Sequence, residues 1–371
     1  MVTTKRIFGL DILRAVAILL VLLSHSKALM YQFAPKETID FYFKNIGMIG
    51  VEIFFILSGF LIGTILIKTF YIEKGNIVKK VYNFWIKRWF RTLPNYYFFL
   101  GVNVLFYFYF RNITFFDYSY LFFMQNFASH AKIPFQESWS LTIEEWFYIL
   151  LPIIFVTIFS LKIFTAKSKI LFAIIFTIVF FASFRFYELY SSNHISFSAV
   201  NKIVLYRLDS LIYGVLMAYV IFFYKNILQK YKYILFEIGI ILFCTIYISM
   251  LLGLKFNTFV VAMFFYPVLD ISIMLLVPFF YFYKESANIR FSKILVSHIA
   301  KVSYSMYLSN LIVLYFFLTY LQHTTVSKSF GFILWISFFL CVVMISSITY
   351  FVIEKRFINL RKYFLIREKA T

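Results

Sequence analysis

Long apolar runs follow one another along almost the whole chain, with short polar segments between them. Ten runs reach the roughly 20 residues that a helix needs to cross the hydrocarbon core of a bilayer. They cover residues 8–28, 46–67, 93–110, 146–164, 170–187, 203–223, 234–252, 258–282, 303–321 and 330–352. The pattern predicts an all-α, polytopic membrane helix bundle of about ten transmembrane helices.

Composition agrees with a membrane location. Hydrophobic residues make up 63% of the 371 residues and charged residues 14%, whereas soluble domains are about half apolar. The runs follow too closely for separate soluble domains, so we expect a single membrane domain over residues 1–371. A net charge of +20 would suggest nucleic acid in a soluble protein. Here the basic residues lie between apolar runs, so we expect membrane lipid as their partner and no nucleic acid.

The distribution of Lys and Arg predicts the orientation. With the N-terminus inside, the inner segments hold 25 of these residues and the outer segments 9, while Arg14 and Arg207 lie within spans. Cytoplasmic loops carry the excess of positive charge in membrane proteins. Both termini are therefore predicted to be cytoplasmic, and the longest outer loop runs from 111 to 145.

The first span contains Asp11, Arg14 and His25. Arg14 and His25 are eleven residues apart, which on a helix is about 20° from full turns and a rise of roughly 16 Å. Asp11 lies one turn before Arg14, so the three form a polar stripe that we expect to face the bundle interior. Charges inside spans are costly and favour a functional site. The alternative is an Asp11–Arg14 pair that stabilises packing, with His25 as an interfacial residue.

The second span holds Glu52, Ser58 and Gly59. Ser58 and Gly59 are small residues, which permit a close approach of two helices. Glu52 is expected to be buried and to need a partner. The candidates for that partner are Arg14, His25 and Arg207.

Two further segments carry candidate chemistry. Arg88 and Arg91 precede the third span and are three residues apart, so on a helix they point the same way. Two guanidiniums at that spacing suit a phosphate, although inner-loop basic residues are common in any membrane protein. Glu144 and Glu145 stand at the outer entrance of the fourth span. Their negative charge can interact either with the positive N-terminal end of the helix dipole or with a histidine at the same depth. Under this topology that histidine is His25.

The remaining polar residues suggest structure more than chemistry. Arg207 and Asp209 are two apart, do not share a helix face, and each needs a different partner. His130, His194, His298 and His323 fall in loops or at span ends. Cys244 and Cys341 lie in apolar runs, where packing is favoured over a disulfide, and no metal-binding spacing of Cys and His occurs.

The sequence resembles the acyltransferase-3 family of integral membrane acyltransferases over nearly its whole length. Six segments carry the resemblance in order: Leu10–Ala15 with His25 (a basic-x10-His signature), Phe54–Phe60 (F-F-x-x-S-G-F), Arg88–Arg91 (R-x-x-R), Trp139–Glu145 (W-S-L-x-x-E-E), Arg207–Asp209 (R-L-D) and Ser303–Leu308 (S-Y-S-x-Y-L). Each segment alone is a weak signal, and their order together with ten spans is a strong one.

Two departures from the family pattern matter. Family members often have a His two residues after the last of these segments, where this chain has Asn310, so we assign no catalytic role to that position. Some members also carry a fused extracytoplasmic hydrolase-like domain. This sequence ends about 20 residues after the tenth predicted span, so we expect it to act alone or to pass the acyl group to a separate extracytoplasmic partner protein.

The resemblance implies O-acyl transfer in the bacterial cytoplasmic membrane, with acyl-CoA, expected to be acetyl-CoA, as cytoplasmic donor and no metal. The implied acceptor is an extracytoplasmic or lipid-linked cell-surface polysaccharide. In this hypothesis Arg88 and Arg91, with Ser58, bind the donor. Arg14, paired with Asp11, lies on the acyl path.

The same hypothesis places the chemistry at the outer face. His25 deprotonates the acceptor hydroxyl or briefly carries the acyl group. Glu144, with Glu145 beside it, sets the tautomer of His25. An alternative function is a transporter or flippase of lipid-linked sugars or anions, in which the same charges line a path. A further one is a structural subunit for polysaccharide assembly.

Overall fold

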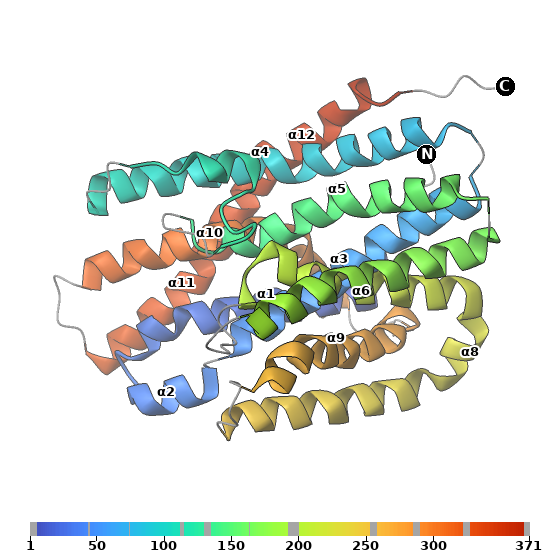
Figure 1. Cartoon of the computed structure of the whole chain (residues 1–371). Helices are drawn as coiled ribbons and strands as arrows, with labels where there is room; N and C mark the ends of the chain where they lie inside the picture. Colours follow the sequence, from blue (N-terminus) through green and yellow to red (C-terminus); the bar gives the residue numbers. More distant parts are fainter. Residues whose placement is uncertain are drawn as a thin grey trace. The chain divides into compact units, whose positions relative to one another are not determined.

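The computed structural model describes residues 6–43, 45–73, 75–111, 115–129, 135–162, 164–191, 200–252, 258–284, 290–321 and 327–366, and every regular element within them is helical (Figure 1). The long helices are α1 (Phe8–Met30), α3 (Ile46–Tyr71), α4 (Ile77–Arg111), α5 (Ser138–Ser160), α6 (Ala166–Ser191), α8 (Val204–Leu251), α9 (Phe259–Tyr281), α10 (Arg290–Leu321) and α11 (Lys328–Thr349). Shorter elements are α2 (Lys36–Phe43), the 3-10 helices η1 (Tyr118–Phe122) and η4 (Arg361–Tyr363), the π-helical turn η3 (Tyr350–Glu354) and α12 (Lys355–Leu360). The predicted all-α fold is confirmed.

Within the described residues, eight helices are long and apolar enough to cross a membrane. One of them, α8, contains both predicted runs 203–223 and 234–252 and has a non-helical residue between them, Tyr224, with φ −132° and ψ 34°. A further predicted run, 93–110, forms the second half of α4. The chain is thus a multi-pass membrane protein, because in lipid a helix satisfies its own backbone hydrogen bonds.

One predicted boundary differs clearly from the structure. Helix α5 begins at Ser138, eight residues before the predicted start at 146. The two glutamates lowered the apparent hydropathy of this segment, but Leu141, Ile143 and Glu145 are all buried. Glu144 and Glu145 therefore lie in the second turn of α5, inside the helix.

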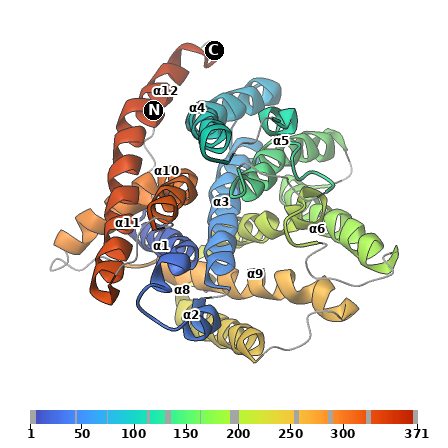
Figure 2. The ribbon, with the colours of Figure 1, turned by 90° about the vertical axis from the view of Figure 1, so that its left-hand side faces the viewer.

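The described chain divides into two compact units. The first contains α1, α2, the start of α3, the second part of α8, the end of α9, α10 and α11. Within it, α1 packs against both α10 and α11, and Figures 1 and 2 show these three helices side by side. The polar residues of α1 therefore face side chains from the C-terminal third of the chain.

The second unit contains the rest of α3, α4 to α6, the first part of α8, most of α9 and residues 353–371. Within it, Gly59 and Gly63 of α3 meet Gly214 and Ala218 of α8. A Cβ atom added at Gly59 would lie 1.8 Å from the carbonyl oxygen of Leu211, and one added at Gly214 would lie 2.1 Å from that of Ile56. The predicted close approach at Gly59 is confirmed, and it follows the small-xxx-small pattern of membrane helix pairs.

Candidate active site

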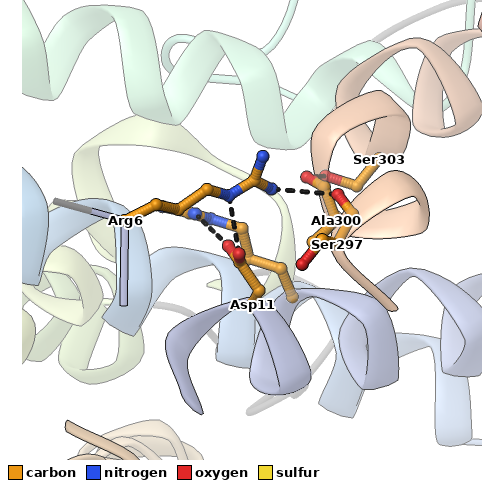
Figure 3. Close-up of polar contacts among 6 residues, drawn as sticks. Arg6, Asp11, Ser297, Ala300 and Ser303 are labelled. Atoms are coloured by element: carbon orange, nitrogen blue, oxygen red, sulfur yellow. Dashed lines mark hydrogen bonds and ion pairs between the residues drawn. The ribbon is translucent and has the colours of Figure 1, made fainter. Parts of the chain in front are cut away.

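A cluster of charges lies at the start of α1 (Figure 3). The buried carboxylate of Asp11 pairs with Arg6, at 2.6 Å between Nε and Oδ2, and with Arg14, at 3.3 Å between Nη1 and Oδ1. Arg6 also donates to the carbonyl oxygen of Ser297 on α10, at 3.2 Å. The predicted Asp11–Arg14 pair is confirmed, and the added Arg6 leaves the cluster with one net positive charge. Such a cluster suits an anionic ligand.

His25 lies near the other end of α1, where its Nδ1 is 2.5 Å from Oδ1 of Asn310 on α10. The next residue, Ser26, accepts a hydrogen bond of 3.0 Å from Trp335 Nε1 on α11. His25, in the predicted polar stripe, therefore contacts α10 directly through Asn310, whereas Asp11 is linked to α10 through Arg6, which binds Ser297. Asn310 of α10 thus contacts the imidazole itself, and Trp335 of α11 binds the neighbouring Ser26.

In the second unit, a chain of hydrogen bonds joins α3 to α5. The Ser58 and Tyr148 hydroxyls are 2.6 Å apart, and Tyr148 donates to Glu144 Oε2 at 2.8 Å. The Arg88 guanidinium of α4 lies 5.4 Å from the centre of the Tyr148 ring, within range of a cation–π interaction. The structure thus brings together Ser58, Arg88 and Glu144, which the sequence placed in three separate segments.

Arg88 and Arg91 have different neighbours. Arg91 points to the buried Glu354, with 3.7 Å between Nε and Oε1, and 45% of its side chain is exposed. Arg88 is half-buried against Tyr148 and Phe84. Of these two arginines, Arg91 is therefore the one that combines an exposed side chain with a carboxylate that orients it.

The other predicted polar residues are buried. Glu52 is fully buried on α3, and Glu145 on α5 faces Trp89 and Thr92 of α4. Glu137, which precedes α5, is also buried, and this burial raises the pKa of its carboxyl to about 8. Two buried carboxyl groups, those of Glu137 and Glu145, therefore lie at the start of α5.

Arg207 and Asp209 have separate partners, as predicted. Asp209 forms a two-pronged ion pair with Arg185 of α6, at 2.8 and 3.1 Å, in which both side chains are 1% exposed. The Arg207 guanidinium lies 3.1 Å from the centre of the Tyr266 ring on α9. Arg185 also donates to the carbonyl oxygen of Tyr206. These contacts tie α6, α8 and α9 together, which indicates a structural role.

Several residues that the structure shows to be buried or in polar contacts were not among those predicted from the sequence. Asp270 is a carboxylate within a predicted span and is fully buried, so its charge within an apolar run was a signal present in the sequence. Tyr148 follows Glu144 by four residues, which is contact spacing on a helix. The roles of Arg6, Arg185 and Asn310 had no local signal, because their partners are distant in the sequence.

The remaining histidines and cysteines give little indication of a functional role. His298 lies on α10 and its Nε2 is 2.9 Å from Ser347 Oγ. Cys244 and Cys341 are free thiols, as predicted. Three further histidines lie outside the described residues: His130, His194 and His323.

The pairing predicted between His25 and Glu144 joins the two units, since His25 is in the first and Glu144 in the second. It stays a prediction. Within the first unit, the contact to His25 Nδ1 comes from Asn310, the residue to which the sequence analysis gave no role.

Comparison with known proteins supplies the context for these contacts. The model of a family described as an acyltransferase domain matches residues 7–352. A Staphylococcus aureus (strain COL) protein, provisionally named an O-acetyltransferase, is 28% identical over 336 residues, which are 84% of this chain and 51% of that protein. The peptidoglycan O-acetyltransferase OatA of Listeria monocytogenes is 28% identical over 174 residues, 40% of this chain and 24% of OatA.

A Bacillus subtilis protein, provisionally named the peptidoglycan O-acetyltransferase YrhL, is 33% identical over 171 residues, which are 40% of this chain and 23% of YrhL. The chain therefore spans about half or less of the length of these relatives. No solved structure matches it.

Proposed function

This chain belongs to the acyltransferase family whose model spans residues 7–352, and on that premise we propose that it is a membrane-embedded O-acetyltransferase. It moves an acetyl group from cytoplasmic acetyl-CoA to a hydroxyl of an extracytoplasmic or lipid-linked cell-surface polysaccharide, in the bacterial cytoplasmic membrane. The names of two relatives point to peptidoglycan as an acceptor of this kind. The acetyl group passes directly to the glycan or through a separate extracytoplasmic protein.

The observation that carries this proposal is the placement of His25. An imidazole inside a membrane helix, held at Nδ1 by a side chain that accepts a hydrogen bond, presents a basic Nε2. Nε2 can take the proton of the acceptor hydroxyl while the hydroxyl oxygen attacks the carbonyl carbon of the thioester. The C–S bond then breaks, and the CoA thiolate leaves and takes up a proton. The same Nε2 can instead attack the thioester and carry the acetyl group, so both roles need the same tautomer.

The donor fits the exposed cationic groups. Arg91 is 45% exposed and oriented by Glu354, so it can donate to a phosphate of CoA, with Arg88 one helical turn away. Arg14 lies in the cluster with one net positive charge, which supports a place for it on the path of the acyl group, where it attracts the anionic donor. Asp11 holds Arg14 in that position.

The test is acetyl transfer by the purified chain in proteoliposomes, with radiolabelled acetyl-CoA and a glycan acceptor. His25→Ala should lower turnover about 10²–10⁴-fold, the usual contribution of a general base. His298→Ala is the matched control, because it removes a hydrogen-bonded histidine of the same unit and should leave turnover near that of the wild type. A His25→Ala variant with wild-type turnover would refute the proposed role.

The same assay distinguishes acetyl transfer from the alternative function of a transporter or flippase. A transporter or flippase would move lipid-linked sugars without consuming acetyl-CoA, so its wild-type protein would release no CoA. Mass spectrometry of surface glycans from a deletion strain then identifies the acceptor, because the acetylated sugar disappears.

A further inference from the structure

Asn310 sits at the contact between α1 and α10, and its own contacts fix which way its amide faces. The Nδ2 group donates to the carbonyl oxygens of Met306, at 3.2 Å, and Tyr307, at 2.6 Å. An amide nitrogen is a donor only. With both carbonyls on the nitrogen side, the amide oxygen is the atom that faces His25 Nδ1, at 2.5 Å.

The amide orientation in turn fixes the tautomer of the histidine. The amide oxygen is an acceptor only, so the hydrogen bond requires that Nδ1 of His25 carries the proton. In a neutral imidazole the lone pair is then on Nε2. Asn310 is fully buried and uncharged, so it orients the ring without adding a charge of its own.

The residues on either side of this pair are also held. Ser26, next to His25, accepts from Trp335 Nε1, and Ser309, next to Asn310, lies 3.0 Å from Ser346 Oγ. Both partners are on α11. The contact between His25 and Asn310 is therefore flanked on both helices by hydrogen bonds to α11, which limit how far α1 and α10 can shift relative to each other.

We propose that Asn310 is a positioning residue for catalysis, which holds His25 in the Nδ1–H tautomer with Nε2 as the reacting nitrogen. The proposal rests on the proposed function of His25, but the tautomer itself does not depend on any activity. Asn310 contacts the histidine and not the reacting atoms, so its loss should lower turnover and leave substrate affinity nearly unchanged.

The first test is kinetic. Asn310→Leu keeps the side-chain size but removes the acceptor, so kcat should fall about 10- to 1,000-fold, because an imidazole in the wrong tautomer is a poor base. The KM for acetyl-CoA should change less than about threefold. The matched control is Asn103→Leu, since Asn103 is also fully buried and donates to a backbone carbonyl of its own helix, that of Phe99. Its kcat should stay near that of the wild type.

The second test measures the tautomer directly. The wild-type chain, labelled with ¹⁵N-histidine and placed in lipid nanodiscs at pH 8, should show a His25 ring with protonated Nδ1 and unprotonated Nε2. The signal is assigned by its absence in His25→Ala. In Asn310→Leu the ring should shift toward the Nε2–H tautomer.

The outcomes are separable. A wild-type His25 with its proton on Nε2 would overturn the proposal, and so would an Asn310→Leu variant with wild-type kcat. A wild-type protein without acetyl transfer would instead refute the proposed function, and the NMR measurement would still decide whether Asn310 sets the tautomer.

Discussion

The close contact of α3 with α8 gives a sharp test of the fold. Gly59→Ala adds one methyl group where a Cβ atom would lie 1.8 Å from the carbonyl oxygen of Leu211 and 2.8 Å from its carbonyl carbon. Ordinary contact begins near 3.4 Å, so the methyl is about 1.6 Å too close to the oxygen. The atoms in its way are backbone, so no side-chain rotation relieves the overlap and the helices must move apart.

The expected cost follows from two opposing effects. Replacing Gly by Ala inside a helix stabilises the helix by about 1 kcal/mol. Overpacking typically costs about 1–3 kcal/mol and sometimes more, and here the separation also weakens the packing of Gly63 on Val215 and Ala218. In lipid such packing is a main source of helix association. We expect the cost of overpacking to exceed the gain in helix propensity, with a net destabilisation of about 1–3 kcal/mol.

The assay is thermal unfolding of the purified protein in detergent at one fixed heating rate. Gly59→Ala should lower the apparent Tm by at least about 3 °C. Gly101→Ala is the matched control, because Gly101 is also in a helix and a Cβ atom there meets nothing within 4 Å. Its Tm should stay the same or rise slightly.

An unchanged or higher Tm in Gly59→Ala would refute the packing argument. An equal fall in Tm in both variants would also refute the packing argument, since the loss of stability would then have a cause other than the contact with α8.

Three further predictions concern single side chains. Tyr148→Phe removes the hydroxyl between Ser58 and Glu144, so it should destabilise the protein by about 1–3 kcal/mol, and an unchanged Tm would contradict the bridge. Arg91→Lys replaces the planar fork by a point charge and should weaken acetyl-CoA binding about tenfold or more; unchanged affinity in a binding titration would limit Arg91 to its pairing with Glu354. Burial raises the pKa of the Glu137 carboxyl from 4.5 to about 8, so the folded state holds a proton that the unfolded state has released, and stability is lost as the pH rises from about 4.5 to 8. Glu137→Gln stays neutral at every pH, so its Tm relative to the wild type should be higher at pH 8.5 than at pH 5, and an equal difference at both would count against the raised pKa.

Contacts between residues close in the sequence were predictable. Asp11 and Arg14 are three apart on a helix, so their pairing followed from spacing alone. Arg207 and Asp209 are two apart, so their different partners followed from the same geometry, although the identity of those partners did not. Gly59 was predicted to allow close approach because it has no side chain, but nothing in its own segment named α8 as the helix it would meet.

The start of α5 shows where a hydropathy pattern misleads. Glu144 and Glu145 lower the average apolarity of the segment, so the predicted span began after them. In the structure they lie within the helix, and Glu144 accepts a hydrogen bond from the Tyr148 hydroxyl. A hydropathy average counts a carboxylate as exposed to lipid, whereas a partner within the protein makes its burial possible.

The sequence by itself determined the membrane class, the helical fold and the positions of the charged residues within the spans, because a bilayer demands long apolar helices and makes charges within them easy to recognise. Only the tertiary structure decided which of those residues meet. His25 and Asn310 are 285 residues apart, and Ser58 and Tyr148 are 90 apart. Such pairs depend on which helices pack together and on how each helix is rotated about its axis. Both depend on the fit of side chains over the whole interface between helices, so they cannot be predicted from any single segment of the chain.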